Sequence, residues 1–322
     1  MAAEHGVFLK AYGATDRGRI REYNEDVVLV VRGLGLFAVA DGAGGHEAGD
    51  VAADAAARAL TKHIETHAAS APASAGALAH LSIDPEARLL SAAFHRAHRD
   101  VVAVARAART TKGMGTTLVA TYFSEDGSRV HIAHVGDSRC YRLRGEHLEA
   151  MTVDHSIGMD LLEKRPDLDD KVLGSLPRHV VTRAIGMGDD FRVSVQTRAV
   201  VLGDRYLLCS DGISSFLPAW ELAEVMRTEK TPDAAVSSLI ARANAAGGQD
   251  NMAAVVIDCT QGAAQAIPIE PPAVRVGKTP IRSSDPELLI LGIEDLDLSG
   301  PTDAATDDLI RALGLAVKKH RK

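Results

Sequence analysis

The sequence of 322 residues has little of several features that define whole classes of protein. Its three cysteines, Cys140, Cys209 and Cys259, are odd in number and far apart, so neither a disulfide framework nor a cysteine zinc site is indicated. No apolar run approaches the roughly 18 residues of a membrane span. The first residues, MAAEHGVFLKAYG, lack the basic start and apolar stretch of a signal peptide. These absences predict a cytoplasmic protein with reduced thiols and no membrane segment.

Positive charge is also scarce. Lysine and arginine number 36 against 43 acidic residues, and the net charge of −7 does not favour binding to nucleic acid or to an anionic membrane. Aromatic residues make up only 4% of the chain, but hydrophobic residues make up 46%, which is ample for a buried core. We therefore expect an ordinary globular protein, and we expect it to be a monomer.

Strand-like and helix-like segments occur in clusters. Apolar runs rich in β-branched residues predict strands at 26–32, 35–40, 116–123, 129–135, 140–144, 191–197, 205–210 and 252–258. Helical spacing of apolar residues predicts helices at 47–68, 85–108, 218–227 and 232–246. Because the strands follow one another closely rather than alternating with helices, the order predicts an α+β fold with antiparallel pairing.

The composition changes near the C-terminus and suggests two parts, residues 1–260 and 261–322. The second part begins with a proline-rich stretch without periodicity, which indicates a linker and tail. A short helix is predicted at about 303–319. The apolar run LLILGIEDLDL within the tail has two readings, a contact with a partner protein or an extra strand or helix packed on the domain.

One stretch, FAVADGAGGHEAGD at 37–50, is unusual because a strand ends on an acid and is followed by several glycines. A nucleotide-binding loop would need glycine at the first, third and sixth positions, and from Gly42 the sixth position is Glu47. A tight turn into the next helix explains the glycines. It does not explain Asp41, which leaves a metal site to be considered.

Four further acids share the setting of Asp41, since each lies at the end of a predicted strand: Asp26, Asp137, Asp211 and Asp250. Antiparallel pairing of the last two strands would bring Asp211 and Asp250 to the same edge of a sheet. Carboxylates that converge without basic partners repel one another. A hard divalent cation with oxygen ligands removes this repulsion, and glycine at 42 would allow a carbonyl to approach it.

Eight motifs occur in an order that resembles the metal-dependent serine/threonine protein phosphatases of the PPM, or type 2C, family, in particular its bacterial branch. They are REYNED (21–26), DGAGGHEAG (41–49), GMGTTL (113–118), HVGDSR (134–139), DHS (154–156), TRAIG (182–186), CSDG (209–212) and DN (250–251). The resemblance covers about residues 10–258. It implies a β-sandwich of two antiparallel sheets flanked by helices, in agreement with the order of the predicted elements.

The resemblance also implies a binuclear Mn²⁺ or Mg²⁺ centre. Asp41 would bridge the two ions, and the Gly42 carbonyl would bind the second. Asp211 and Asp250 would complete the shell of the first. A water shared by the ions would then attack the phosphorus of phosphoserine or phosphothreonine on proteins that a serine/threonine kinase has phosphorylated.

Further residues are implied around this centre. Asp137, together with Asp211, would form a weaker third metal site. Glu25 and Asp26 would hold metal-bound water, and Arg21 would bind the phosphate of the substrate.

The chain departs from the family pattern in two places. Ala43 stands where animal members carry a histidine proposed as the leaving-group acid. His46 opens a helix, which favours a capping or packing role, and His134 and His155 are interpreted as structural. The segment 157–181 corresponds to the flap that shapes substrate choice, but it follows the family only at its ends, so the substrate preference cannot be transferred.

Three other functions are compatible with parts of the pattern. A non-catalytic relative that binds phosphoproteins would be expected to have lost metal-binding aspartates, and this chain keeps them. A two-metal nuclease would need a basic stripe for a polyanion. A phosphatase of small molecules has the same chemistry and differs only in the substrate that it turns over.

Overall fold

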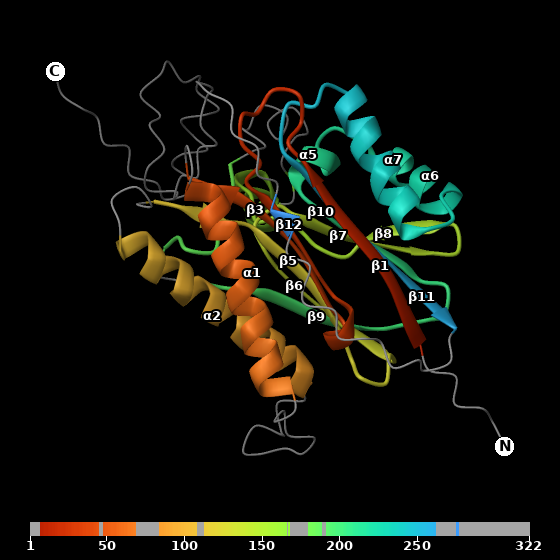
Figure 1. The fold of residues 1–322 in the computed structure, drawn as a ribbon, viewed down its shortest axis with the longest axis horizontal. Helices are drawn as coiled ribbons and strands as arrows, with labels where there is room; N and C mark the ends of the chain where they lie inside the picture. The colour runs from red at the N-terminus through yellow and green to blue at the C-terminus, as the bar shows by residue number, and fades with distance from the viewer. Residues whose placement is uncertain are drawn as a thin grey trace.

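The computed structural model describes residues 7–44, 48–68, 84–107, 113–165, 167, 180–188, 191–261 and 275–276. Two β-sheets lie between two pairs of helices (Figure 1). None of the helices in this described part combines the length and apolar character that a bilayer span requires. The predicted helix at 303–319 and the apolar run of the tail lie outside the described residues.

The first sheet has five strands in the order β1-β11-β10-β7-β8. These are β1 Val7–Asp16, β7 Arg139–Arg144, β8 His147–Ala150, β10 Arg205–Cys209 and β11 Met252–Gln261. No apolar pattern predicts a strand before residue 26, so β1 is not expected from the sequence. Its sequence VFLKAYGATD contains a glycine and lacks a clear alternation, and its conformation is imposed by antiparallel pairing with β11 over all ten residues.

The second sheet has the order β12-β2-β3-β5-β6-β9, with β4 paired to β3. Its strands are β2 Asp26–Val31, β3 Leu36–Ala43, β4 Gly115–Thr116, β5 Leu118–Phe123, β6 Arg129–Val135, β9 Ser194–Ala199 and β12 Arg275–Val276. Neighbouring strands of the ladder pair antiparallel throughout. The predicted strands are therefore confirmed with small changes at their ends.

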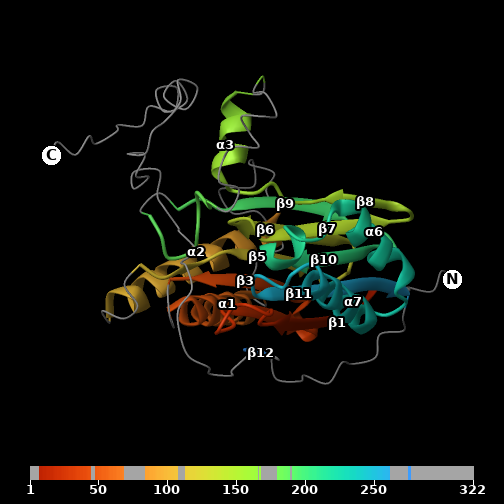
Figure 2. The ribbon, with the colours of Figure 1, turned by 90° about the horizontal axis from the view of Figure 1, so that it is seen from above.

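Helices cover the outer faces of both sheets. Helix α1 Ala48–His67 and helix α2 Pro85–Ala107 bury alanine-rich faces against the second sheet. Helix α6 Ala219–Thr228 and helix α7 Pro232–Ala245 pack on the first sheet. Short segments complete the fold: η1 Arg32–Leu34, α3 Ile157–Lys164 and α5 Asp211–Ser214. Figure 2 shows α3, within the predicted flap, projecting away from the two sheets.

Three aromatic rings pack where the sheets face each other. The Phe123 ring makes edge contacts with Phe37 at 6.0 Å and with Tyr206 at 5.6 Å between ring centroids. These rings come from both sheets and belong to one buried cluster of Val, Ile, Leu and Cys side chains. Since each ring buries a large apolar surface, the three rings contribute much of the packing between the sheets, together with the aliphatic side chains of the cluster. The α+β sandwich expected from the sequence is confirmed, and it presents the strand ends at one edge.

Candidate active site

Five aspartates, which we call the acid cluster, meet at this edge of the sandwich. Asp26 opens β2 and lies opposite Asp41 in the ladder with β3. Asp137 follows β6, Asp211 follows β10 and Asp250 precedes β11. The other four aspartates all act on Asp41 electrostatically, so residues spread over more than 200 positions share one site. The prediction that Asp211 and Asp250 share an edge is confirmed, because β10 and β11 pair antiparallel.

Burial and mutual repulsion raise the pKa values of these acids. Burial raises the pKa of Asp41 well above its usual range, and the neighbouring carboxylates, Asp26 first among them, raise it further. Burial likewise raises the pKa of Asp26 and of Asp137. Burial and then the Asp250 charge raise the pKa of Asp211 to about 6. The folded chain therefore holds charge that is poorly compensated by its own residues.

A divalent cation fits this arrangement. The Oδ1 atom of Asp26 is buried and has no hydrogen-bond partner, whereas its Oδ2 accepts a hydrogen bond of 2.7 Å from the Ser210 hydroxyl. An unpaired buried carboxylate oxygen costs free energy unless a proton, a water or a cation satisfies it. All the ligand atoms that the cluster offers to a metal are oxygens, which Mn²⁺ and Mg²⁺ prefer.

The glycines after Asp41 allow the backbone to pass close to the site. A Cβ atom at Gly42 would lie 2.1 Å from the carbonyl oxygen of Gly49, and one at Gly49 would lie 2.4 Å from Oε1 of Glu25. Instead, the Gly49 N–H donates a hydrogen bond of 3.2 Å to that oxygen. Any larger side chain at these positions would push helix α1 away from β3 and from Glu25.

Arg21 lies in the loop before β2 and reaches the cluster. Its Nη2 and Nε atoms lie 3.0 Å from Oδ2 and Oδ1 of Asp250, in a forked ion pair. This geometry is the one that guanidinium groups use for carboxylates and phosphates alike. Arg21 therefore lies at the edge of the acid cluster, and its guanidinium group binds the Asp250 carboxylate.

Two residues without an assigned role in the sequence analysis hold the site together. Asn251 accepts a hydrogen bond of 2.9 Å from the Glu25 N–H and donates bonds of 2.9 Å and 2.8 Å to the carbonyls of Arg17 and Tyr23. It thereby fixes the loop that carries Arg21. Ser210 bonds Asp26 and accepts from the Ala253 N–H at 2.9 Å. Their sequence signal is their place in the CSDG and DN motifs, beside Asp211 and Asp250.

His134 and His155, which lie outside the cluster, are satisfied by structural hydrogen bonds. His155 accepts from the Gly136 N–H at 3.2 Å, so its other ring nitrogen donates to the Ser194 hydroxyl at 2.9 Å. Burial lowers the pKa of His155 to about 3 and also lowers that of His134, which bonds the Val153 carbonyl at 2.7 Å. Both are therefore neutral at pH 7. His46 lies outside the described residues.

The cysteines offer no nucleophile. All three are free and buried. Burial raises the pKa of the Cys209 thiol to about 12, and it also raises the pKa of Cys140 and Cys259. Since only the thiolate attacks, these groups are inert at neutral pH.

A different carboxylate and histidine group lies at the opposite end of β6. Asp84, Glu86 and His131 could hold a metal by their spacing. However, Arg129 pairs with both carboxylates, and Asp84 caps helix α2 by accepting from the Glu86 N–H at 3.0 Å. His131 is buried and bonds Thr197 and Glu86 at 2.9 Å and 3.1 Å. This group joins α2 to β6 and β9, and none of it belongs to the predicted site.

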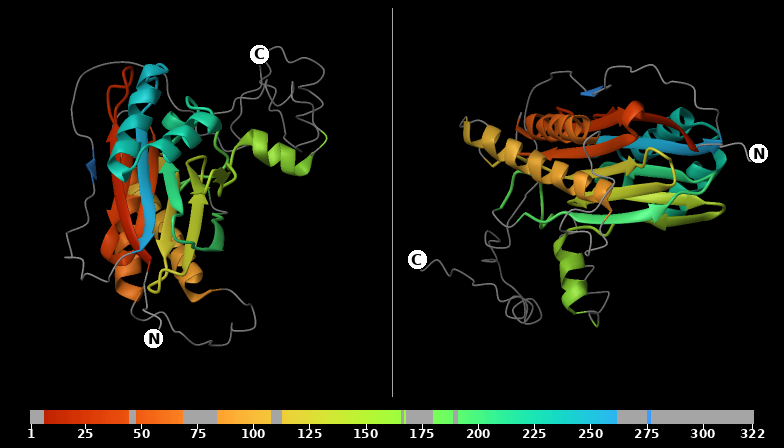
Figure 3. Two further views of the ribbon diagram at one scale, coloured as in Figure 1. Left: turned by 90° about the vertical axis from the view of Figure 1, so that its right-hand side faces the viewer. Right: turned by 90° about the horizontal axis from the view of Figure 1, so that it is seen from below.

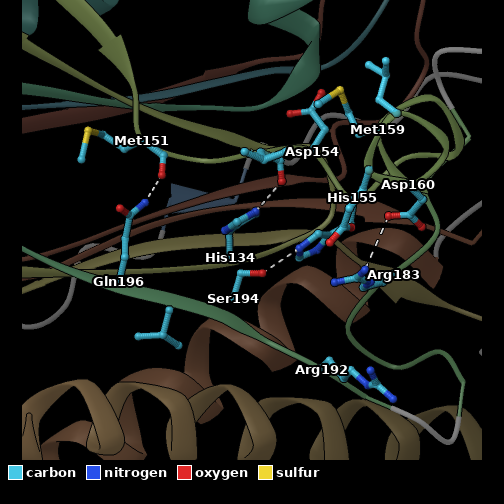
Figure 4. Close-up of a pocket in the computed structure, with 14 residues that line it drawn as sticks. His134, Met151, Asp154, His155, Met159, Asp160, Arg183, Arg192, Ser194 and Gln196 are labelled. Atoms are coloured by element: carbon cyan, nitrogen blue, oxygen red, sulfur yellow. Dashed lines mark hydrogen bonds and ion pairs between the residues drawn. The ribbon is translucent and has the colours of Figure 1, made fainter. Parts of the chain in front are cut away.

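A pocket of about 730 Å³ lies against the start of the flap, and none of the five aspartates of the acid cluster lines it (Figure 4). Asp154 lines it and is held by Arg139, two residues beyond Asp137, at 2.8 Å and 2.6 Å. Figure 4 shows Asp160 and Arg183 on the side of the flap and Gln196 on the opposite side. The pocket therefore lies between Asp154, the ion-pair partner of Arg139, and the segment 157–181 that is associated with substrate choice.

Comparison with known proteins agrees with the geometry. The model of the family described as Protein phosphatase 2C matches residues 21–256. The serine/threonine phosphatase Stp of Listeria monocytogenes is 33% identical over 247 residues, which are 76% of this chain and 93% of that protein. The crystal structure of the Mycobacterium tuberculosis serine/threonine phosphatase PstP is 32% identical with a TM-score of 0.66, covering 79% of this chain and 100% of that one.

A second structure bears on the metal. The catalytic domain of PstP in complex with two manganese ions is 30% identical to this chain with a TM-score of 0.65, and the match covers 79% of this chain and 100% of that one. The match to the family extends over most of the chain and includes the whole acid cluster. The chain therefore belongs to the protein phosphatase 2C family, in its bacterial branch, and is a metal-dependent serine/threonine protein phosphatase.

Proposed function

We propose that the acid cluster holds two Mn²⁺ or Mg²⁺ ions and that Asp41 contacts both. Asp211 and Asp250 would hold the first ion and the Gly42 carbonyl the second, while Glu25 and Asp26 would act through water. Asp137 and Asp211 would form a weaker third site. The unsatisfied, buried Oδ1 of Asp26 among acids with raised pKa values is the observation that carries this proposal.

The ions, when bound, would acidify a water for attack on phosphorus and neutralise phosphate charge. The chain itself would orient the substrate. Arg21 would exchange Asp250 for two phosphate oxygens, since both anions fit its fork. Asn251 would keep Arg21 in place through the loop that it holds. Ala43 has no acidic proton to give to the leaving group, so another donor must supply it.

The substrates would be phosphoserine and phosphothreonine residues of intact proteins, phosphorylated by a serine/threonine kinase in the cytoplasm. The pocket beside Asp154 has room for residues that flank the phosphorylated one. We further propose that residues 1–260 form the catalytic domain, that 261–322 form an appended linker and tail, and that the protein acts as a monomer.

Metal stoichiometry tests the proposed centre. Titration calorimetry of the EDTA-treated, re-dialysed protein with Mn²⁺ should give two tight equivalents and a weaker third one. Asp137→Asn should lose the weak equivalent and keep both tight ones, because only the third site uses Asp137. Asp100→Asn on helix α2, where Asp100 pairs with Arg96, serves as the control. A single tight equivalent in the wild type would overturn the assignment of Asp41 as a shared ligand.

Arg21→Ala should mainly raise KM. Loss of a forked, charge-assisted contact costs about 1.5–3 kcal/mol, which is roughly a 10- to 100-fold increase of KM. The KM of Arg21→Lys should lie between those of the wild type and Arg21→Ala, because lysine keeps the charge without the forked geometry. Arg58→Ala on the exposed surface of α1 is the control. Steady-state kinetics on a phosphothreonine peptide measures the effect, and unchanged kinetics would place the phosphate contact elsewhere.

A further inference from the structure

The second sheet has an edge that is only partly covered. Strand β2 pairs with β3 along all six of its residues. On its other side the only partner within the described residues is β12, where Arg275 lies opposite Val28 and Val276 opposite Val27. Figure 3 shows β12 beyond the N-terminal strands, at the margin of the molecule.

Without a covering strand, the backbone of such an edge would be a liability. Strand β2 has the sequence DVVLVV, and the residues Val27 and Val28 are each 1% exposed. A buried, β-branched strand with free N–H and C=O groups is a template for pairing with another chain. Natural sheets protect such strands by covering them, and a short antiparallel segment does this with backbone hydrogen bonds alone.

The covering segment lies outside the shared catalytic fold. The family match ends at residue 256, and 79% of this chain accounts for the whole of the solved PstP chain. Residues 275–276 lie nineteen and twenty positions beyond the end of the match. The strand is thus an addition of this chain to a fold that is complete without it.

The covered positions lie next to the acid cluster. Val27 directly follows Asp26, which opens β2 and pairs with Asp41, and Glu25 precedes it. Pairing at Val27 and Val28 restrains the same end of the strand that presents these acids. We propose that this docking of residues 275–276 on β2 in cis stabilises the Glu25–Asp26 end of the strand.

Hydrogen exchange of the full-length protein tests the docking. Successive residues of a strand point their N–H groups to opposite sides, so one of Arg275→Pro and Val276→Pro must remove a ladder donor. In that variant the peptide that contains β2 should exchange about 10-fold faster or more, while the β10 peptide is unchanged. Gln265→Pro, in the tail but outside β12, is the matched control. Equal exchange of β2 in all four proteins would overturn the docking.

Metal affinity tests whether the docking stabilises the Glu25–Asp26 end. This test rests on the proposed metal centre. Calorimetry should show severalfold weaker Mn²⁺ binding in the proline variant whose β2 exchanges faster, and wild-type binding in Gln265→Pro. Faster exchange with unchanged Mn²⁺ affinity would overturn the stabilisation of the Glu25–Asp26 end. Absence of Mn²⁺ binding in the wild type would instead contradict the proposed centre, and the exchange result would be unaffected.

Discussion

Replacing Asp41 by asparagine is expected to lower turnover of a phosphothreonine peptide by about two to three orders of magnitude, a loss typical for the removal of a key electrostatic group. Asparagine keeps the shape of the side chain but not its charge, and the proposed centre would lose its shared ligand. Asp211→Asn should have a similar effect, because Asp211 shares the site and is also buried among like charges.

The same change should stabilise the metal-free protein. Burial and four neighbouring carboxylates disfavour the charged form of Asp41, so a neutral side chain removes repulsion. Differential scanning fluorimetry in EDTA should show a higher Tm for Asp41→Asn than for the wild type, while Asp100→Asn leaves both turnover and Tm unchanged. An inactive variant with a lowered metal-free Tm would mean that Asp41 supports the fold rather than the metal centre.

Removal of metal is expected to abolish activity entirely. EDTA should bring turnover of the phosphothreonine peptide to background, and added Mn²⁺ should restore it, because no residue of the described site can replace the activated water. Inhibitors of the okadaic acid type should have no effect. p-Nitrophenyl phosphate serves as a parallel substrate, and turnover of that compound without turnover of the peptide would indicate a small-molecule phosphatase. Full activity in EDTA would contradict a metal-dependent reaction.

The stabilising effect of Mn²⁺ on the fold should increase with pH. The pKa of Asp211 is raised to about 6, above the value of about 3.9 in an unfolded chain. Its protonated form therefore stabilises the metal-free fold below pH 4, and this contribution is lost as the pH rises through 6. Mn²⁺ replaces the protons, so its stabilising effect on Tm should be larger at pH 7.5 than at pH 5.

Other groups oppose this trend in the metal-free protein. His155 and His134 are buried and neutral with lowered pKa values, so they destabilise the fold as the pH falls below about 6.5. Comparing the wild type with Asp211→Asn at both pH values isolates the carboxylate. If the two proteins respond to Mn²⁺ and pH in the same way, Asp211 is not part of the group that titrates.

Much of the site could be predicted from the sequence because each acid is marked locally. Asp41, Asp137, Asp211 and Asp250 all stand beside glycine or asparagine at the end or start of an apolar strand, a pattern that survives without knowledge of the fold. The antiparallel order of the last two strands even predicts that Asp211 and Asp250 share an edge, and the pairing of β10 with β11 confirms it.

Other features depend on contacts between distant residues and leave no local signal. Strand β1 has a weak strand pattern, and it is extended because β11 pairs with all of it. Asn251 and Ser210 belong to the DN and CSDG motifs, but their hydrogen-bond partners lie in a loop and a strand 184 or more positions away and have no local signal.

Whether a feature can be predicted from the sequence depends on whether its signal is local. The amino-acid sequence by itself determined the secondary structure of most strands, the order of the motifs and the chemical character of the site, because these depend on residue type and short spacing. Only the tertiary structure decided that Gly42 touches Gly49, that Arg21 holds Asp250 and that β12 covers β2. Those contacts depend on register and on the approach of backbones, which are set by the packing of the whole sandwich.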